Sequence, residues 1–129
     1  MNKIVLALSI FILLFSGKAN PQEKIDTDLS ETFAYYFYQT GDYQKAIEEY
    51  TRILQNTENK AKIHYNLGCI YSKTGNYPQA IKEFQQAAQT NGKIKKEAQY
   101  NLMVIYGKHL NDSGQASEYY NKFKNNQEK

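Results

Sequence analysis

The feature that most restricts how this chain can fold is a repeat of about 34 residues. The stretch 40–50 (TGDYQKAIEEY) matches the stretch 74–84 (TGNYPQAIKEF), with paired residues 34 positions apart. A second match joins 65–71 to 100–106, which share Tyr-Asn-Leu and Ile-Tyr at a spacing of 35. A fixed period of about 20–50 residues is typical of proteins built from stacked copies of one small unit. We therefore expect an array of such units.

The spacing of apolar residues predicts two helices in each unit. In the middle unit apolar residues recur every three or four positions, at Leu67, Ile70 and Tyr71 and again at Ala80, Phe84 and Ala87. Gly68 and Ala80 are small, which predicts that the two helices approach closely there. Gly75 is placed to form a left-handed cap, and Pro78 suits the first turn of the next helix. The stretch 111–114 (NDSG) predicts the turn before the last helix.

These residues resemble the tetratricopeptide repeat family, whose repeats carry Leu-Gly and Tyr in a first helix and Ala, an aromatic residue and Ala in a second. The middle repeat matches this pattern at Leu67, Gly68, Tyr71, Gly75, Tyr77, Ala80, Phe84 and Ala87. The first repeat has Phe33, Ala34, Phe37, Tyr50 and Ile53 in the corresponding places, and the third keeps Leu102, Tyr106, Ala116 and Tyr120. The third repeat departs from the pattern, because Met103 stands where a small residue belongs and its turn is one residue longer.

The resemblance implies an all-α fold, in which three tandem helix-turn-helix hairpins form a short right-handed α-solenoid. The predicted repeats span 27–60, 61–94 and a divergent 95–124, with a short linker at 20–26 and a tail at 125–129. Three repeats are about the minimum for a stable stack. Because no polar capping helix follows the last repeat, we expect an apolar edge that needs a neighbour.

Residues 1–19 have the layout of a secretory signal peptide. Lys3 precedes an apolar run at 4–15 that only Ser9 interrupts, and small residues before Asn20 suit cleavage after Ala19. The run is short for a spanning helix, which needs about 20 apolar residues. We therefore predict an exported protein, periplasmic or secreted, that is not bound to a membrane after cleavage. An uncleaved N-terminal anchor is the less favoured alternative.

In the tetratricopeptide family the first helices line a concave groove that binds peptides. The predicted groove residues are Tyr35, Tyr38, Tyr65, Asn66, Cys69, Lys73, Tyr100, Asn101 and Lys108. Exposed rings with interleaved amides suit peptide recognition, although the tyrosines could instead pack hairpin against hairpin. Binding of chaperone tails through a terminal carboxylate is rejected, because Glu31, Tyr35 and Glu97 stand where that sub-family needs basic or amide residues.

The sequence offers no catalytic or metal-binding motif, and no cofactor is predicted. His64 and His109 are not in a metal-spaced motif, and His64 is expected to pack within its hairpin. Cys69 is the only cysteine, so no internal disulfide can form, and we expect it to be inert. Glu83, like Glu48 and Glu49, is expected to face solvent on a second helix.

The charges of the chain are separated along its length. Without Lys3 and Lys18 the net charge is only +1, which argues against nucleic-acid binding. Residues 20–59 carry a net charge of −5 and residues 60–129 carry +6. Such a molecule could stack head to tail or orient a charged partner, or its charges could simply be solvated.

The predicted function is a non-catalytic protein-protein interaction module or scaffold of the cell envelope; the alternative is a structural protein that self-associates through its terminal helices.

Overall fold

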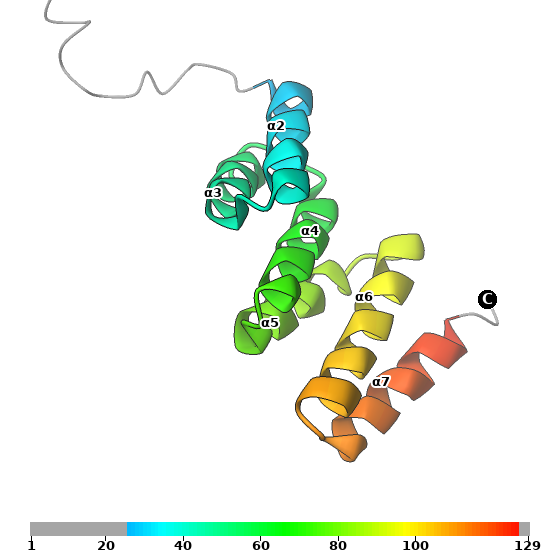
Figure 1. Ribbon diagram of the computed structural model, residues 1–129. Coiled ribbons are helices and arrows are strands. Elements are labelled where there is room, and N and C mark those ends of the chain that lie inside the picture. The colour runs from blue at the N-terminus through cyan, green and yellow to red at the C-terminus, as the bar shows by residue number, and fades with distance from the viewer. Residues whose placement is uncertain (1–25, 127–129) are drawn as a thin grey trace, which may run out of the picture.

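The computed structural model describes residues 26–126 as an array of three helical hairpins (Figure 1). The helices are α2 (Thr27–Thr40), α3 (Tyr43–Leu54), α4 (Lys60–Lys73), α5 (Tyr77–Ala87), α6 (Lys93–Val104) and α7 (Ser113–Asn125), and a π-helix, η1 (Ile105–His109), continues α6. No strand occurs within this range. The predicted all-α solenoid of three hairpins is therefore confirmed. The predicted signal peptide at 1–19 and most of the linker lie outside the described residues.

The second helix of each hairpin begins with the same capping arrangement. The side chains of Asp42, Asn76 and Asp112 each accept a hydrogen bond from the backbone N–H three residues later. An oxygen at this position satisfies one of the N–H groups that a helix start leaves without a partner. Pro78 follows Asn76 in the first turn of α5, as predicted. Local sequence therefore fixes where each second helix starts.

The turn inside each hairpin needs one residue with a positive φ. Gly41 (φ 82°) and Gly75 (φ 78°) fill this position in the first two hairpins, and Gly75 confirms the predicted left-handed cap. In the third hairpin the residue is Asn111, with φ 54°. Gly114, which we had expected in this turn, lies instead in the first turn of α7. Asn can replace Gly here because it tolerates the left-handed region better than other residues with a side chain.

The buried side chains form two clusters, one at each junction between hairpins. The first cluster joins α2 and α3 to α4, and the second joins α5 to α6 and α7. Gly68 of α4 faces the ring of Phe84 in α5 so closely that an added Cβ would lie 2.8 Å from two ring carbons. The close approach predicted at Gly68 is therefore present, and it makes room for a fully buried aromatic ring.

The third hairpin differs from the second in register. In the second hairpin the cap residue Asn76 lies five residues after Tyr71, whereas in the third Asp112 lies six residues after Tyr106. The π-helix η1 contains the extra residue. Tyr119 is buried in α7 and stacks on Tyr106 with ring centroids 5.7 Å apart.

Tyr120 matches the aromatic residue of the family pattern in the sequence, but its ring is 51% exposed. Met103 replaces the small residue that admits Phe84 in the second hairpin, so the third hairpin has no matching space. The ring of the preceding residue, Tyr119, packs in its place.

The two terminal helices of the array differ in chemistry. On α7, every residue classed as exposed is polar or glycine except Tyr120. The apolar edge that we expected after the last repeat is therefore not found there. At the other end α2 has four large side chains that are each more than half accessible: Tyr35, and the three residues Leu29, Phe33 and Tyr36, which recur at helical spacing. We call these three residues the stacking face.

None of the helices in the described part is both long enough and apolar enough to cross a membrane.

Candidate functional site

A cavity of about 200 Å³ lies where α2 and α4 meet α3. Seven side chains line it: Tyr35, Tyr38, Tyr50, Tyr65, Asn66, Cys69 and Ile70. The first helices supply all of them except Tyr50, which comes from α3. Four tyrosine rings around one small space offer a large contact area with hydroxyl groups at its edge.

A second cavity of about 320 Å³ adjoins the first, because Tyr65 lines both. Its other lining residues are Lys93, Lys96, Glu97, Tyr100, Asn101 and Phe123. The amide nitrogen of Asn101 donates a hydrogen bond of 3.3 Å to the hydroxyl oxygen of Tyr65. Together the two cavities form a continuous surface that we call the tyrosine groove.

The structure brings most of the predicted groove residues together. An eighth residue, Lys73, lies at the edge of the groove and contacts Tyr38. The other seven line the cavities: Tyr35, Tyr38, Tyr65, Asn66, Cys69, Tyr100 and Asn101. The Lys73 ammonium lies 5.4 Å from the centre of the Tyr38 ring, which is cation–π geometry. Lys108 is exposed in η1 and lines neither cavity. Its predicted role in the groove has no support from this arrangement.

Several lining residues were missed by sequence reasoning. Tyr50 was noted only as part of the repeat pattern, and Lys93 and Lys96 were not among the predicted groove residues. The spacing does indicate that Lys96 belongs to the groove, because Lys96 lies four residues before Tyr100 and therefore shares its helix face. Phe123 carried no such signal. It reaches the groove from α7, and its ring centroid lies 5.8 Å from that of Tyr100.

Burial controls the ionisation of the groove residues. It raises the pKa of Tyr65 to about 12, with the neighbouring Cys69 acting in the same direction and Asn101 opposing it. Burial also raises the pKa of the Cys69 thiol, although the Tyr65 hydroxyl lowers it by a smaller amount. The thiolate, which is the reactive form, is therefore scarce near neutral pH. This agrees with the expectation that Cys69 is chemically inert.

Tyr50 allows a test of this burial by pH. Burial raises its pKa to about 12, against about 10 in an unfolded chain. The folded state holds the proton more tightly, so the resulting stability is complete below about pH 10 and is lost as the pH rises towards 12. From about pH 9 to about pH 12, the wild type should lose on the order of 2 kcal/mol more unfolding free energy than Tyr50→Phe. Denaturant titrations at both pH values measure this, and equal losses would contradict the buried hydroxyl.

One acidic residue does not lie where the sequence suggested. Glu83 was expected to face solvent, but its side chain is only 16% exposed and its Oε2 lies 2.7 Å from Nδ1 of His64. The contact joins α4 to α5, so His64 does sit within its hairpin.

In the part of the chain that the structure describes, no three His, Cys, Asp or Glu side chains gather closely enough to hold a metal ion.

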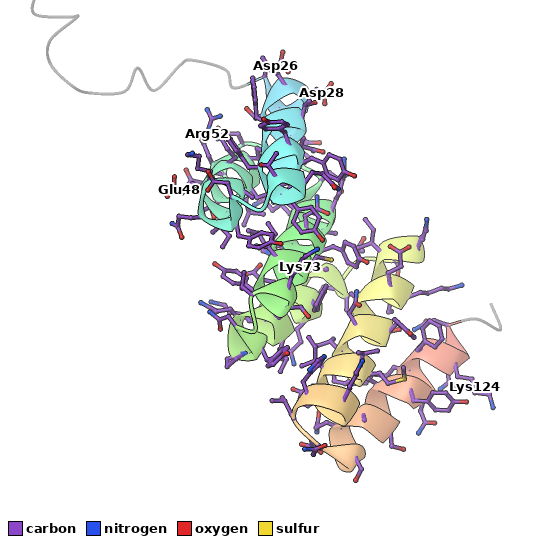
Figure 2. All side chains as sticks on the ribbon, in the orientation of Figure 1. Asp26, Asp28, Glu48, Arg52, Lys73 and Lys124 are labelled. Atoms are coloured by element: carbon purple, nitrogen blue, oxygen red, sulfur yellow. The ribbon has the colours of Figure 1, made fainter. Side chains whose placement is uncertain are left out.

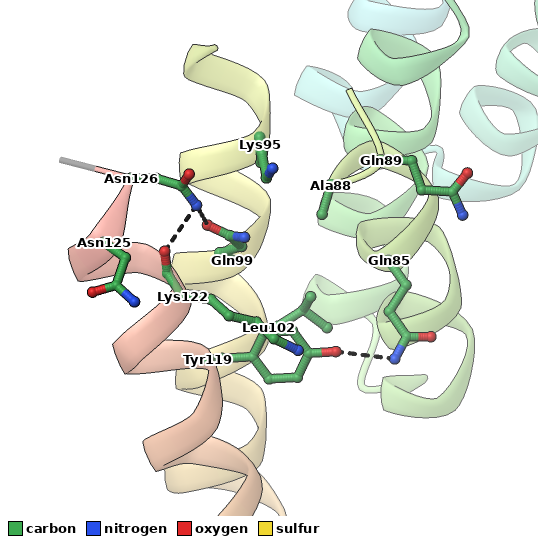
Figure 3. A pocket seen from close by; sticks show the side chains of 10 residues that line it. All are labelled: Gln85, Ala88, Gln89, Lys95, Gln99, Leu102, Tyr119, Lys122, Asn125 and Asn126. Atoms are coloured by element: carbon green, nitrogen blue, oxygen red, sulfur yellow. Dashed lines mark hydrogen bonds between the residues drawn. The ribbon is translucent and has the colours of Figure 1, made fainter. Parts of the chain in front are cut away.

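A larger depression, of about 460 Å³, lies between α5 and the pair α6 and α7 (Figure 3). Two hydrogen bonds join polar side chains that line it: Asn126 donates to the Gln99 oxygen (2.9 Å), and Gln85 donates to the Tyr119 hydroxyl (3.2 Å). These bonds hold α7 against its neighbours. The tyrosine groove instead presents aromatic rings at an accessible surface, so we take the groove as the candidate site.

Comparison with known proteins supports the repeat assignment. A family model for the TPR repeat matches residues 34–75, and one for the tetratricopeptide repeat matches residues 61–93. The chain is similar to the photosystem I assembly protein Ycf3 of Acaryochloris marina (strain MBIC 11017), with 31% identity over 91 residues. The match covers 63% of this chain and 54% of that protein, so the chain spans about half the length of this curated relative. Residues 34–93 thus carry tetratricopeptide repeats.

Proposed function

We propose that this chain is a non-catalytic binding module that holds a peptide segment of a partner protein in the tyrosine groove. The observation that carries the proposal is the cavity walled by four tyrosine rings from three helices. Such rings supply contact area with little loss of side-chain freedom, and tyrosine is enriched among the residues that dominate binding energy.

The polar residues of the groove suit an extended backbone. Asn66 and Asn101 lie on equivalent positions of α4 and α6, one in each cavity. An amide side chain can both donate to and accept from a peptide group. Tyr35 and Tyr100 are about half exposed, so a ligand could cover them without unfolding any helix.

Two further points support an assembly role. Tetratricopeptide repeats generally mediate contacts between proteins, and the relative described above is named as an assembly protein. We propose that this chain likewise brings other polypeptides together. We also propose that it acts in the cell envelope or outside the cell, a proposal that rests on the signal-like composition of residues 1–19.

Replacing both Tyr65 and Tyr100 by alanine should abolish peptide capture. The chain is produced in a host that exports it, and mass spectrometry of the product shows whether residues 1–19 are removed. A phage-displayed library of random peptides supplies ligands, whose affinity is measured by calorimetry. Two dominant contacts are worth roughly 3 kcal/mol together, so the double variant should bind at least about 100-fold more weakly.

The control variant removes Tyr36 and Tyr120, two tyrosines outside the groove that are about half exposed, as Tyr100 is. This variant should bind the selected peptides as the wild type does, and circular dichroism should show equal helicity for all three proteins. If Tyr65→Ala/Tyr100→Ala still binds the peptides, the groove assignment is wrong.

A further inference from the structure

The stacking face of α2 repeats positions that are buried elsewhere in the molecule. Its members correspond, 34 residues on, to Ile63, Leu67 and Ile70 of α4, and a further 35 residues on, to Ala98 and Leu102 of α6 and Ile105 of η1. The side chains of α4, α6 and η1 at these positions are at most 3% exposed, whereas those of Leu29, Phe33 and Tyr36 are 51–59% exposed. The same positions are apolar in all three repeats but uncovered in one.

The internal junctions show what covers these positions. On α4 they pack in one cluster with Ala46, Tyr50 and Ile53 of α3, and on α6 they pack with Ala80, Phe84 and Ala87 of α5. The covering element is in each case the second helix of the preceding hairpin. Among the helices described, α7 is the one second helix that has no first helix stacked on it. A second copy of this chain therefore carries the type of helix that α2 lacks.

The charges of the two ends favour the same pairing. In the described chain, residues 26–59 hold seven acidic and two basic residues (net −5), and residues 60–126 hold four acidic and ten basic residues (net +6). Asp26 and Asp28 lie at the first turn of α2, at the end of the molecule opposite Lys124 (Figure 2). Opposite charges on the two parts of the molecule attract copies in a head-to-tail orientation and disfavour pairing of like ends, and α7 itself carries two lysines against one glutamate.

The geometry also brings these charged groups together. Within the molecule the last residue of α3, Leu54, is joined to the first residue of α4, Lys60, by a short connection, so the end of a second helix lies near the start of the next first helix. A copy of α7 placed in the same way on α2 would bring its last turn, with Lys124, near Asp26 and Asp28. Tyr120, the half-exposed aromatic residue of α7, would supply apolar contact.

We propose that copies of this chain stack head to tail, with α7 of one copy on the stacking face of the next, in the position that α3 holds on α4. The contact is heterologous, so it leaves a free end on each copy and allows chains of more than two. One helix from each partner buries less than the roughly 800 Å² per partner of a standard interface. The association is therefore weak and strengthens with concentration.

Two single variants test the proposal, each at a position that is more than half exposed and outside both buried clusters. Phe33→Glu blocks the stacking face but leaves α7 intact, and Tyr120→Glu blocks α7 but leaves the stacking face intact. Sedimentation from about 10 μM to about 1 mM covers the range in which such weak contacts form. The average mass of the wild type should at least double over this range, while each variant alone should stay monomeric.

An equal mixture of the two variants gives the deciding result. The intact α7 of the Phe33→Glu copy can bind the intact stacking face of the Tyr120→Glu copy, and the complex must stop at two. The mixture should therefore form dimers where neither variant does, and these should weaken when about 0.5 M salt shortens the Debye length to about 4 Å.

Three outcomes overturn the proposal. They are a wild type that stays monomeric, a mixture that stays monomeric, and a Tyr120→Glu variant that still dimerises, which would indicate pairing of two α2 helices. The groove variant Tyr65→Ala/Tyr100→Ala should associate like the wild type, so failure of this proposal and failure of the peptide-binding proposal can be told apart.

Discussion

Replacing Gly68 by valine should destabilise the protein by about 3 kcal/mol. The first added atom would already lie 2.8 Å from two carbons of the Phe84 ring, and the valine methyl groups would need further space. The ring cannot move aside, because it is fully buried and also contacts Tyr65, with ring centroids 5.7 Å apart. The preference of helices for other residues over glycine, worth at most about 1 kcal/mol, is too small to offset this strain. Denaturant unfolding measures the loss.

Gly114→Ala is the matched control, since this glycine also lies in a helix but a Cβ there would meet nothing closer than 3.5 Å. It should be neutral or slightly stabilising. A double variant tests whether the Phe84 ring is the cause. Combining Gly68→Ala with Phe84→Leu should lower the unfolding free energy by less than the sum of the two single changes, because the smaller side chain frees space for the added methyl. Strict additivity would show that the Phe84 ring is not what excludes a side chain at residue 68.

Ile63→Ala and Leu29→Ala should differ by about 3 kcal/mol in unfolding free energy, although the two residues hold the same position in successive repeats. Ile63 is completely buried at the junction of α3 with α4, whereas Leu29 is 53% exposed on α2. Truncating a buried aliphatic side chain removes its contacts and leaves a cavity, at a cost of roughly 2–5 kcal/mol. Truncating an exposed one usually changes stability by less than about 0.5 kcal/mol.

Thermal and denaturant unfolding at low protein concentration would measure both changes, and the low concentration keeps any stacking between copies from contributing. Equal losses would mean that Leu29 is covered in solution as fully as Ile63. In that case the exposed stacking face, and the self-association built on it, would have to be abandoned.

The repeat period carried most of the information about the fold. Spacings of three and four residues placed apolar side chains on one face of each helix, and Gly75 with Pro78 marked where one helix ends and the next begins. These features act within about one helical turn, so they can be read from the chain without knowing what lies beside it. The same periodicity placed Tyr35, Tyr65 and Tyr100 on equivalent faces of the three first helices, and for that reason the groove could be anticipated.

The sequence by itself thus determined three helical hairpins and the faces on which their apolar residues lie. Only the tertiary structure decided which of those residues are covered. Phe33 and Leu67 occupy the same repeat position, yet one is exposed and the other buried, because burial depends on the neighbouring helix and not on local spacing. Likewise the choice of Tyr119 over Tyr120, and the contact of His64 with Glu83, follow from the register of one helix against another. That register is set by the packing of side chains from distant parts of the chain.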